Sequence, residues 1–273
     1  VSAFLLNRSS DPSFLVKDIE ELNGKKRAVA IYNPTDNAAK TTLVFSDIDL
    51  GGTVKLRNVF SKEDLGEFTE QYEVSVPAHG TRIYTVEGEI RLERVRYEAE
   101  TAYISDYQEL KNNQSERTGI YESASFCSAG FKAGWLGYSE QNDLRWRDVY
   151  SVNGGPYDLT IGFICGENRN ITVSVNGEKV QTVSCNSGGW QTVGRKTIRV
   201  NLQKGRNEVR LSNAATWMPD IDYMELQYKG DPTGIRVMEA PSANGSTRAY
   251  DLGGRAATAN SGIRIAHGRK TLK

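Results

Sequence analysis

The chain has 273 residues, enough for two ordinary domains that each bury a core of their own. Its 34 basic and 34 acidic side chains cancel, so no overall field attracts nucleic acid or an anionic membrane, and neutral partners such as glycans fit better. No apolar run approaches the roughly 20 residues that span a bilayer. Two histidines leave little material for a histidine-based nucleophile relay or a transition-metal site.

Three cysteines, Cys127, Cys165 and Cys185, cannot all pair, and their spacings match no zinc pattern. We expect buried free thiols. The alternative for an exported protein is one disulfide, joining Cys185 to either Cys165 or Cys127. Residues 1–6 contain neither a methionine nor a basic region ahead of their apolar residues, so we expect a fragment cut from a longer precursor.

Short alternating segments between turn signals occupy the first third of the chain. This spacing, with β-branched and aromatic residues, is typical of an all-β sandwich. The expected strands are 27–32, 40–45, 53–59, 73–76 and 82–86. A charged, turn-poor stretch, 87–96, then separates this part from a second start at Tyr97. We therefore predict a first domain over residues 1–92.

The same pattern resumes from Tyr97 with more glycine and aromatic residues. The expected strands are 144–150, 157–165, 171–175, 179–184, 196–202, 208–212 and 223–228. Asn176-Gly177 is a strong two-residue hairpin signal. No segment has a sustained helical period, so the predicted fold is all-β, with two antiparallel β-sandwiches in series. The second domain is predicted at 93–229, and 230–273 as a small appendage with weak strand signals at 247–252 and 262–266.

Two acidic pairs stand out in the second domain: Glu98 with Glu100 on an opening strand, and Asp220 with Asp222 before the last strand. Residues two apart on a strand face the same side, and the first and last strands of a sandwich commonly lie side by side. Four carboxylates could therefore converge and bind a hard cation such as Ca²⁺. The alternatives are solvated acids at strand ends, or the acid and base of a glycosidase.

Aromatic residues are concentrated where loops are expected. An aromatic plane packs against the apolar face of a sugar ring, while amides and carboxylates bind its hydroxyls. Core packing is the alternative interpretation, and we expect it for Trp146, which lies inside a predicted strand. Trp217 instead lies in a loop between Asn213 and Pro219. The loop aromatics are Tyr121, Trp135, Tyr138, Trp190 and Trp217.

Several segments of the first domain, in the right order, resemble the C-terminal β-sandwich of family 27 α-galactosidases. They are KRAVAIYN (26–33), FSDI (45–48), RNVF (57–60) with 62–66, and VPAHG (76–80). In that family the sandwich follows a catalytic barrel that carries two catalytic aspartates. No such barrel is present in this sequence, so the resemblance implies no catalytic residue here.

The second domain resembles a carbohydrate-binding module of family 35, a relative of family 6, which implies a β jelly roll. The matching segments are YEAE (97–100), CSAG (127–130), GWLG (134–137), YDLTI (157–161), VNG (175–177), GGWQTVG (188–194), and Asn213 with WMPDIDY (217–223). The resemblance implies a structural Ca²⁺ held by Glu98, Glu100 and Asp222. It also implies sugar binding at the loop end, where Asn213 and Trp217 match. The expected sugar-binding residues are Trp217, Asn213, Trp135, Tyr138, Asn142 and Tyr121.

The tail segments 249–255, 262–263 and 267–270 resemble the C-terminal sorting appendage of exported Bacteroidetes proteins. This implies that Lys273 is the natural C-terminus, and that the parent protein lies outside the cytoplasm, whether extracellular, on the cell surface or in the periplasm.

Together these observations predict a non-catalytic chain that binds polysaccharide or oligosaccharide, possibly galactose-containing, and targets the glycoside hydrolase of its parent protein. Its expected partners are the glycan and its own catalytic domain, with no nucleic acid and no membrane span. One alternative is purely structural, with both sandwiches bracing the catalytic barrel. The other is a glycosidase that uses Asp220 or Asp222 with a glutamate.

Overall fold

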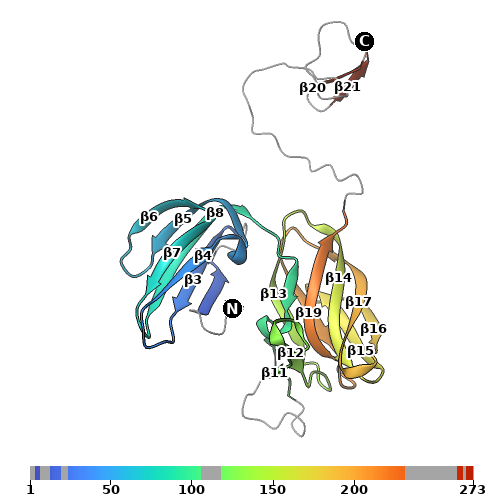
Figure 1. The fold of residues 1–273 in the computed structure, drawn as a ribbon. Coiled ribbons are helices and arrows are strands. Elements are labelled where there is room, and N and C mark those ends of the chain that lie inside the picture. Colours follow the sequence, from blue (N-terminus) through green and yellow to red (C-terminus); the bar gives the residue numbers. More distant parts are fainter. Residues whose placement is uncertain are drawn as a thin grey trace. The chain divides into compact units, whose positions relative to one another are not determined.

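The computed structural model describes residues 4–6, 13–19, 24–105, 118–230, 263–266 and 269–272. The chain divides into two compact units, Val1–Gly230 and Asp231–Lys273. Within the described ranges every regular element is a strand, apart from three short 3₁₀ turns (Figure 1). The predicted all-β class is confirmed, and no helix in these ranges is long and apolar enough to cross a bilayer.

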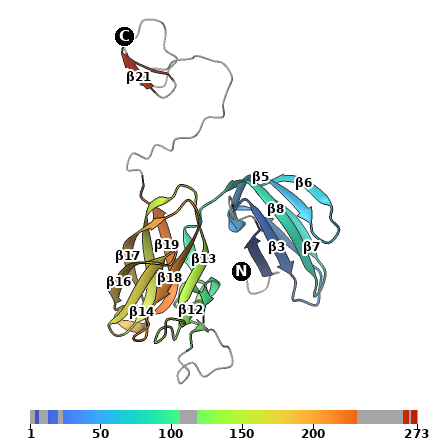
Figure 2. The same cartoon turned by 180° about the vertical axis from the view of Figure 1, so that it is seen from behind.

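The first sandwich packs a six-stranded antiparallel sheet against a two-stranded one (Figure 2). Alternating side chains explain the packing: strand β3, KRAVAIY, buries Arg27, Val29 and Ile31 and turns the residues between them outward. The large sheet, in spatial order, is β1 (Phe4–Leu6), β2 (Ser13–Asp18), β3 (Lys26–Tyr32), β8 (Thr81–Arg91), β5 (Leu50–Asn58) and β6 (Asp64–Thr69); the small one is β4 (Ala39–Val44) with β7 (Gln71–Val76).

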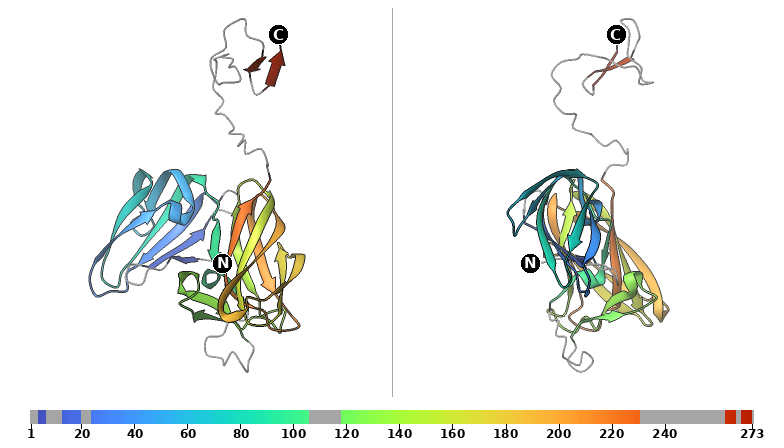
Figure 3. Two further views of the ribbon diagram at one scale, coloured as in Figure 1. Left: turned by 45° about the vertical axis from the view of Figure 1, so that its right-hand side comes forward. Right: turned by 60° about the vertical axis from the view of Figure 1, so that its left-hand side comes forward.

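The second sandwich has a five-stranded and a six-stranded antiparallel sheet that enclose one apolar core (Figure 3). The core contains Trp146, as the sequence predicted. The first sheet is β10 (Tyr103–Ile104), β13 (Leu144–Ser151), β18 (Gly205–Ser212), β15 (Arg169–Val175) and β16 (Glu178–Cys185). The second is β11 (Ile120–Ser123), β12 (Phe131–Gly134), β19 (Asp220–Tyr228), β14 (Gly155–Cys165) and β17 (Gly189–Leu202), with β9 (Arg96–Glu98) also paired to β19.

Two local predictions hold. The Asn176-Gly177 turn joins β15 to β16, and both residues have positive φ, at 51° and 84°, as a two-residue hairpin requires. The three cysteines are free thiols and all are buried. Cys165 lies beside Cys185, since its Sγ donates a hydrogen bond to the Cys185 carbonyl oxygen at 3.3 Å.

The structure corrects two expectations about strands. Residues 87–91, expected to form a connector, belong to β8 and pair with β5. Strand β9 stops at Glu98, and a 3₁₀ turn, Ala99–Thr101, carries Glu100, so Glu98 and Glu100 do not share a strand face. The buried side chain of Ala99 explains the turn, because it fills the core just where the strand would otherwise continue.

In the tail, β20 (Ile263–Ala266) pairs with β21 (Arg269–Leu272), and the first of these lies within the strand predicted at 262–266. The other predicted tail strand, 247–252, lies outside the described residues. So do residues 249–255 and 267–268, on which the resemblance to a sorting appendage depends.

Candidate functional site

Three tryptophans meet at one end of the second sandwich, around a hollow of about 360 Å³. Trp135 follows β12, Trp190 opens β17, and Trp217 lies in the loop between β18 and β19. The rings of Trp135 and Trp217 meet edge to face, with centroids 5.6 Å apart. Trp190 is 47% exposed, so it offers a ring to a ligand. The hollow therefore has two rings that pack against each other, Trp135 and Trp217, and one ring that is accessible to a ligand, Trp190.

The loops that carry Trp135 and Trp217 are held together through their backbones. Gly137 forms a bridge with Trp217, and the Met218 N–H donates to the Leu136 carbonyl oxygen at 2.9 Å. Only glycine fits at position 137, because φ is 107° and an added Cβ would lie 2.4 Å from the Thr216 carbonyl oxygen. This close approach positions both tryptophans before any ligand binds.

A partly buried ion cluster forms the polar side of the hollow. The Lys132 ammonium lies 2.5 Å from Asp220 Oδ2 and 3.3 Å from Glu122 Oε2. The other oxygen of Glu122 accepts a hydrogen bond from the Trp135 indole at 3.2 Å. Burial raises the pKa of Asp220, although the Lys132 ammonium opposes this shift. The two carboxylates and one ammonium of the cluster are balanced in the hollow by the Arg169 guanidinium, and the cluster presents polar atoms beside the rings.

Arg169 connects the two sides of the hollow. Its guanidinium stacks over the Trp190 ring at 4.6 Å and donates to the Met218 carbonyl oxygen at 3.0 Å, next to Trp217. A second arm binds Glu167 Oε1 at 2.6 Å. Arg169 therefore holds the strand that carries Trp190 against the loop that carries Trp217.

The structure places the six predicted sugar-binding residues in different surroundings. Trp135 and Trp217 line the hollow. Tyr138 packs edge-on against Trp217 at 4.7 Å but is not a lining residue. The side-chain oxygen of Asn213, Oδ1, accepts from the backbone N–H groups of Ala215 and Thr216, at 3.2 and 3.3 Å. Asn213 therefore shapes the Trp217 loop.

Asn142 and Tyr121 also serve the fold. Asn142 is fully buried and donates to the carbonyl oxygens of Trp135 and Gly137, at 2.8 and 2.9 Å. Tyr121 packs against the core and donates to the Ala102 carbonyl oxygen at 2.5 Å. Neither lines the hollow.

Sequence reasoning missed most of the polar side of the hollow. Trp190 was recognised as a loop aromatic, and Asp220 as one of an acidic pair, but neither was placed with Trp217. Glu122, Lys132 and Arg169 are ordinary charged residues on three different strands, and no sequence pattern joins them. Strand pairing places β11 beside β12 and β12 beside β19, and the stacking of the two sheets brings Arg169 on β15 to the same hollow.

Two of the three expected Ca²⁺ ligands, Glu98 and Asp222, contact Ser128. Its hydroxyl donates to Glu98 Oε2 at 2.5 Å, and its backbone N–H donates to Asp222 Oδ1 at 2.9 Å. The pairing of β9 with β19 sets Glu98 opposite Tyr223, as expected of first and last strands. Asp220 and Asp222 do not act as a pair: Asp220 binds Lys132, whereas Asp222 binds Ser128. A β-bulge opposite Gly162 and Phe163 interrupts the strand's alternation of side chains between its two faces.

Burial, with a smaller effect of the neighbouring Glu98 and Asp222 carboxylates, raises the pKa of Glu100 to about 7. Burial also raises the pKa of Asp222 to about 6. Glu100 Oε2 is buried and has no hydrogen-bond partner among the described residues. The chemistry of these acids fits a hard cation, yet within those residues no three such side chains form a ready-made metal cluster.

Residues 17–86 match the model of the alpha galactosidase C-terminal beta sandwich domain, which confirms that this part of the first sandwich is similar to such a domain. No curated protein has a matching sequence.

Among solved structures, a family 35 carbohydrate binding module from Clostridium thermocellum is 25% identical, with a TM-score of 0.43 over 49% of this chain and 98% of the module. The CBM35 of Paenibacillus barcinonensis is 22% identical, with a TM-score of 0.42 over 50% and 100% of the two chains. The isomalto-dextranase of Arthrobacter globiformis T6, complexed with panose, is 16% identical, with a TM-score of 0.45 over 78% of this chain and 36% of the enzyme.

Proposed function

We propose that this chain is a non-catalytic module that binds carbohydrate in the hollow between Trp135, Trp190 and Trp217. The observation that carries the proposal is the meeting of these rings beside the Lys132 cluster. Indole faces suit the C–H faces of a sugar ring, and the polar groups suit its hydroxyls. The small volume and the balanced charges favour a neutral terminal sugar over a long or strongly charged ligand.

The match of residues 17–86 to an α-galactosidase accessory sandwich supports a role beside a glycoside hydrolase. In such a protein, bound polysaccharide would raise the effective concentration of substrate at the catalytic domain without adding chemistry to this chain. An extracellular, cell-surface or periplasmic location follows for a module of this kind, and galactose-containing polysaccharide is the first ligand to test.

We also propose that Ca²⁺ binds between Glu98, Glu100 and Asp222. The unsatisfied buried oxygen of Glu100 and the mutual repulsion of these carboxylates support it. A bound cation would compensate the charge of the three carboxylates. The pairing of β9 with β19 holds these acids close together. Ser128, which contacts both Glu98 and Asp222, would orient them.

The test of sugar binding is a glycan array on the whole chain, followed by titration calorimetry with the best ligands. We expect affinities on the order of micromolar to millimolar, given the small ligand contact. Trp190→Ala should weaken binding at least about tenfold, because the exposed ring is lost while the core is untouched.

The matched control is Phe60→Ala, which removes a 66% exposed ring from the first sandwich and should leave affinity unchanged. If the array shows no glycan, or if Trp190→Ala binds as well as the parent chain, the proposed pocket is wrong. A chain that binds no glycan would favour the structural alternative, in which the sandwiches only brace a catalytic domain.

A further inference from the structure

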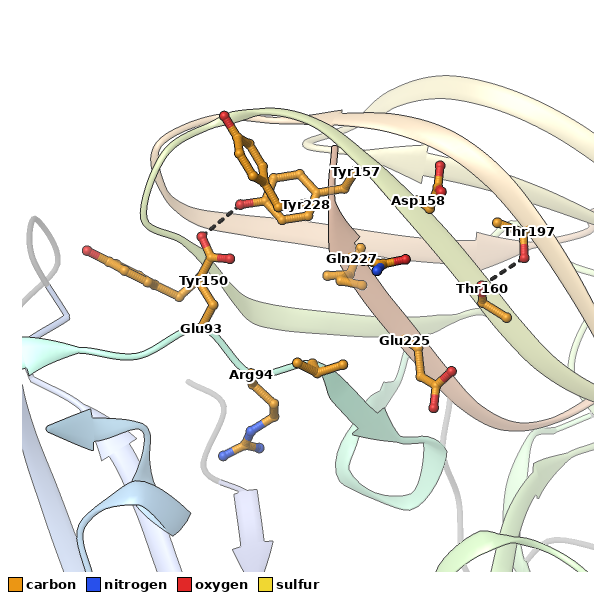
Figure 4. A pocket seen from close by; sticks show the side chains of 12 residues that line it. Glu93, Arg94, Tyr150, Tyr157, Asp158, Thr160, Thr197, Glu225, Gln227 and Tyr228 are labelled. Atoms are coloured by element: carbon orange, nitrogen blue, oxygen red, sulfur yellow. Dashed lines mark hydrogen bonds between the residues drawn. The ribbon is translucent and has the colours of Figure 1, made fainter. Parts of the chain in front are cut away.

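A second and larger hollow, of about 570 Å³, lies on the outer face of the sheet formed by β14, β17 and β19 (Figure 4). The connector that precedes β9 forms one side of it. Strand pairing places it far from the three-tryptophan pocket: Tyr157 pairs with Tyr228 beside this hollow, whereas Ile164 pairs with Asp220 beside the pocket. Seven strand residues separate these two positions on β14, roughly 23 Å at 3.3 Å per residue.

The charged side chains of this groove already have protein partners. Asp158 accepts from Arg199 at 2.8 Å, and Glu225 accepts from Arg96 at 2.7 Å. Glu93 Oε1 accepts from the Tyr157 hydroxyl at 2.7 Å. Cations thus neutralise Asp158 and Glu225, and Glu93 is hydrogen-bonded by neutral donors, the Tyr157 hydroxyl and the Val152 N–H. With these side chains engaged inside the protein, the groove suits a neutral ligand.

Uncharged hydrogen-bonding groups lie along the floor. Gln227 is exposed, and its amide makes no hydrogen bond with any residue that the structure describes. The hydroxyls of Thr160 and Thr197 bond to each other at 2.8 Å, which leaves each with further acceptor capacity. Figure 4 shows Gln227 between this threonine pair and the tyrosine end of the groove. An amide and two hydroxyls can pair with the donor and acceptor sites of several sugar hydroxyls.

Apolar surface completes the groove. The Tyr228 ring is 38% exposed and is held edge-on against Tyr157, with centroids 5.2 Å apart. Val95, on the connector, is 63% exposed. A fixed aromatic ring at one end, amide and hydroxyl groups along the floor and an apolar wall are the parts from which sugar sites are built.

We propose that this groove is a second glycan-binding site, which takes an internal segment of a neutral polysaccharide chain. The greater volume, and a floor formed by a sheet face, favour a chain over a single terminal sugar. The proposal goes beyond the pocket described above and uses none of its residues. Two sites on one module would bind a polymer more tightly than either alone, because the second contact becomes intramolecular.

The test measures affinity of the whole chain for soluble galactomannan, arabinogalactan and xylan by affinity gel electrophoresis. Gln227→Arg places a bulky side chain in the groove from an exposed position, without removing a described contact. The matched control is Gln181→Arg, the same change at an exposed position of β16 in the opposite sheet. Both are measured alone and with Trp190→Ala.

We expect Gln227→Arg to weaken polymer binding about fivefold to tenfold, both alone and in the Trp190→Ala background, while Gln181→Arg has no effect. Tyr228→Ala should act in the same direction. If Trp190→Ala alone abolishes binding to all three polymers, or if Gln227→Arg has no effect beside it, the groove is no binding site although the pocket stands. If only Gln227→Arg matters, the groove stands and the pocket is wrong. If the chain binds none of the polymers, both proposals are wrong.

Discussion

Asn142 shows how a residue predicted to bind sugar can belong to the framework of the site instead. Its amide donates to two backbone carbonyl oxygens, and its own carbonyl oxygen accepts from the Gly119 N–H at 2.8 Å, all in a fully buried position. Asn142→Ala would leave these groups without partners. We expect a loss of about 3 kcal/mol in the free energy of unfolding, measured by urea denaturation.

The control is Asn170→Ala, on an exposed position of β15, which should change stability by less than about 0.5 kcal/mol. If Asn142→Ala keeps its stability but no longer binds sugar, Asn142 contacts the ligand, as the sequence predicted.

Arg169 is a positioning residue whose effect depends on its shape as well as its charge. A lysine at this position keeps the charge but cannot stack as a plane on Trp190 while it donates to the Met218 carbonyl oxygen. We expect Arg169→Lys to weaken sugar binding about tenfold and to shift the Trp190 fluorescence, with little change in stability. Calorimetry and emission spectra give the two measurements.

Arg195→Lys provides the comparison, because Arg195 is an exposed residue of the strand that carries Trp190. Its guanidinium lies 6.0 Å from the centroid of the Tyr223 ring, farther than Arg169 lies from Trp190. It should bind sugar like the parent chain. Unchanged affinity and emission in Arg169→Lys would mean that the stacked guanidinium does not position Trp190.

At the level of elements, the opening strand β9, the 3₁₀ turn and β19 meet with three acids and one unsatisfied carboxylate oxygen. If Ca²⁺ binds there, excess Ca²⁺ should raise the melting temperature by roughly 5 °C over the chelated chain, because it binds only the folded state. Glu100→Gln removes one repelling charge. It should therefore melt higher than the parent chain in chelator and lose most of the response to Ca²⁺.

Differential scanning calorimetry measures both effects. Glu178→Gln, at an exposed position in the β15–β16 hairpin, is the control and should leave the Ca²⁺ response intact. Equal melting temperatures of the parent chain in chelator and in Ca²⁺ would show that these acids are simply solvated.

Long strands that bury one face could be predicted from the sequence, since alternation and turn residues mark them. The strands β3, β14 and β18 lie where the pattern placed them, within a few residues. Strands β6 and β12 were not predicted. The first is a sheet edge that contains Gly66, and the second has only four residues, so both depend on pairing with a partner strand. The local pattern of apolar and polar residues does not indicate which strands pair.

The same reasoning explains the error at Glu100. Period-two spacing predicted a shared strand face for Glu98 and Glu100, but the buried Ala99 and the following turn depend on the shape of the core. The bulge near Asp222 is likewise a property of paired strands. Residue types therefore indicated which side chains could take part, and tertiary pairing decided which of them meet.

For the whole molecule, the three-tryptophan pocket joins residues from four separate parts of the second sandwich, between Glu122 and Asp220. The sequence predicted all three tryptophans to be loop residues, although Trp190 lies in β17, and their partners could be assigned only once the sheet order was known. The pocket and the groove that the connector before β9 borders occupy opposite ends of strand β14. A single polysaccharide chain could thus contact the module at two places.

The last prediction concerns catalysis by the whole chain, which we expect to be absent on an aryl α-galactoside. A glycosidase needs two carboxyl groups that flank the scissile bond and carry different protonation states, one to donate a proton and one to act as base or nucleophile. In the pocket, Glu122 and Asp220 bind the same Lys132 ammonium, at 3.3 and 2.5 Å. This arrangement fixes both acids on one cation at one side of the hollow, and the described residues that line the other side, Arg169, Trp190 and Trp217, include no acid.

The assay follows release of the aryl alcohol over a long incubation, with Asp220→Asn as the comparison. Asp220→Asn should match the parent chain, with both at the rate of buffer alone. Because Asp222 was the other candidate acid in the sequence, Asp222→Asn is assayed in parallel. Turnover by the parent chain that either variant abolishes would identify a catalytic acid, and the module would have to be reclassified as an enzyme.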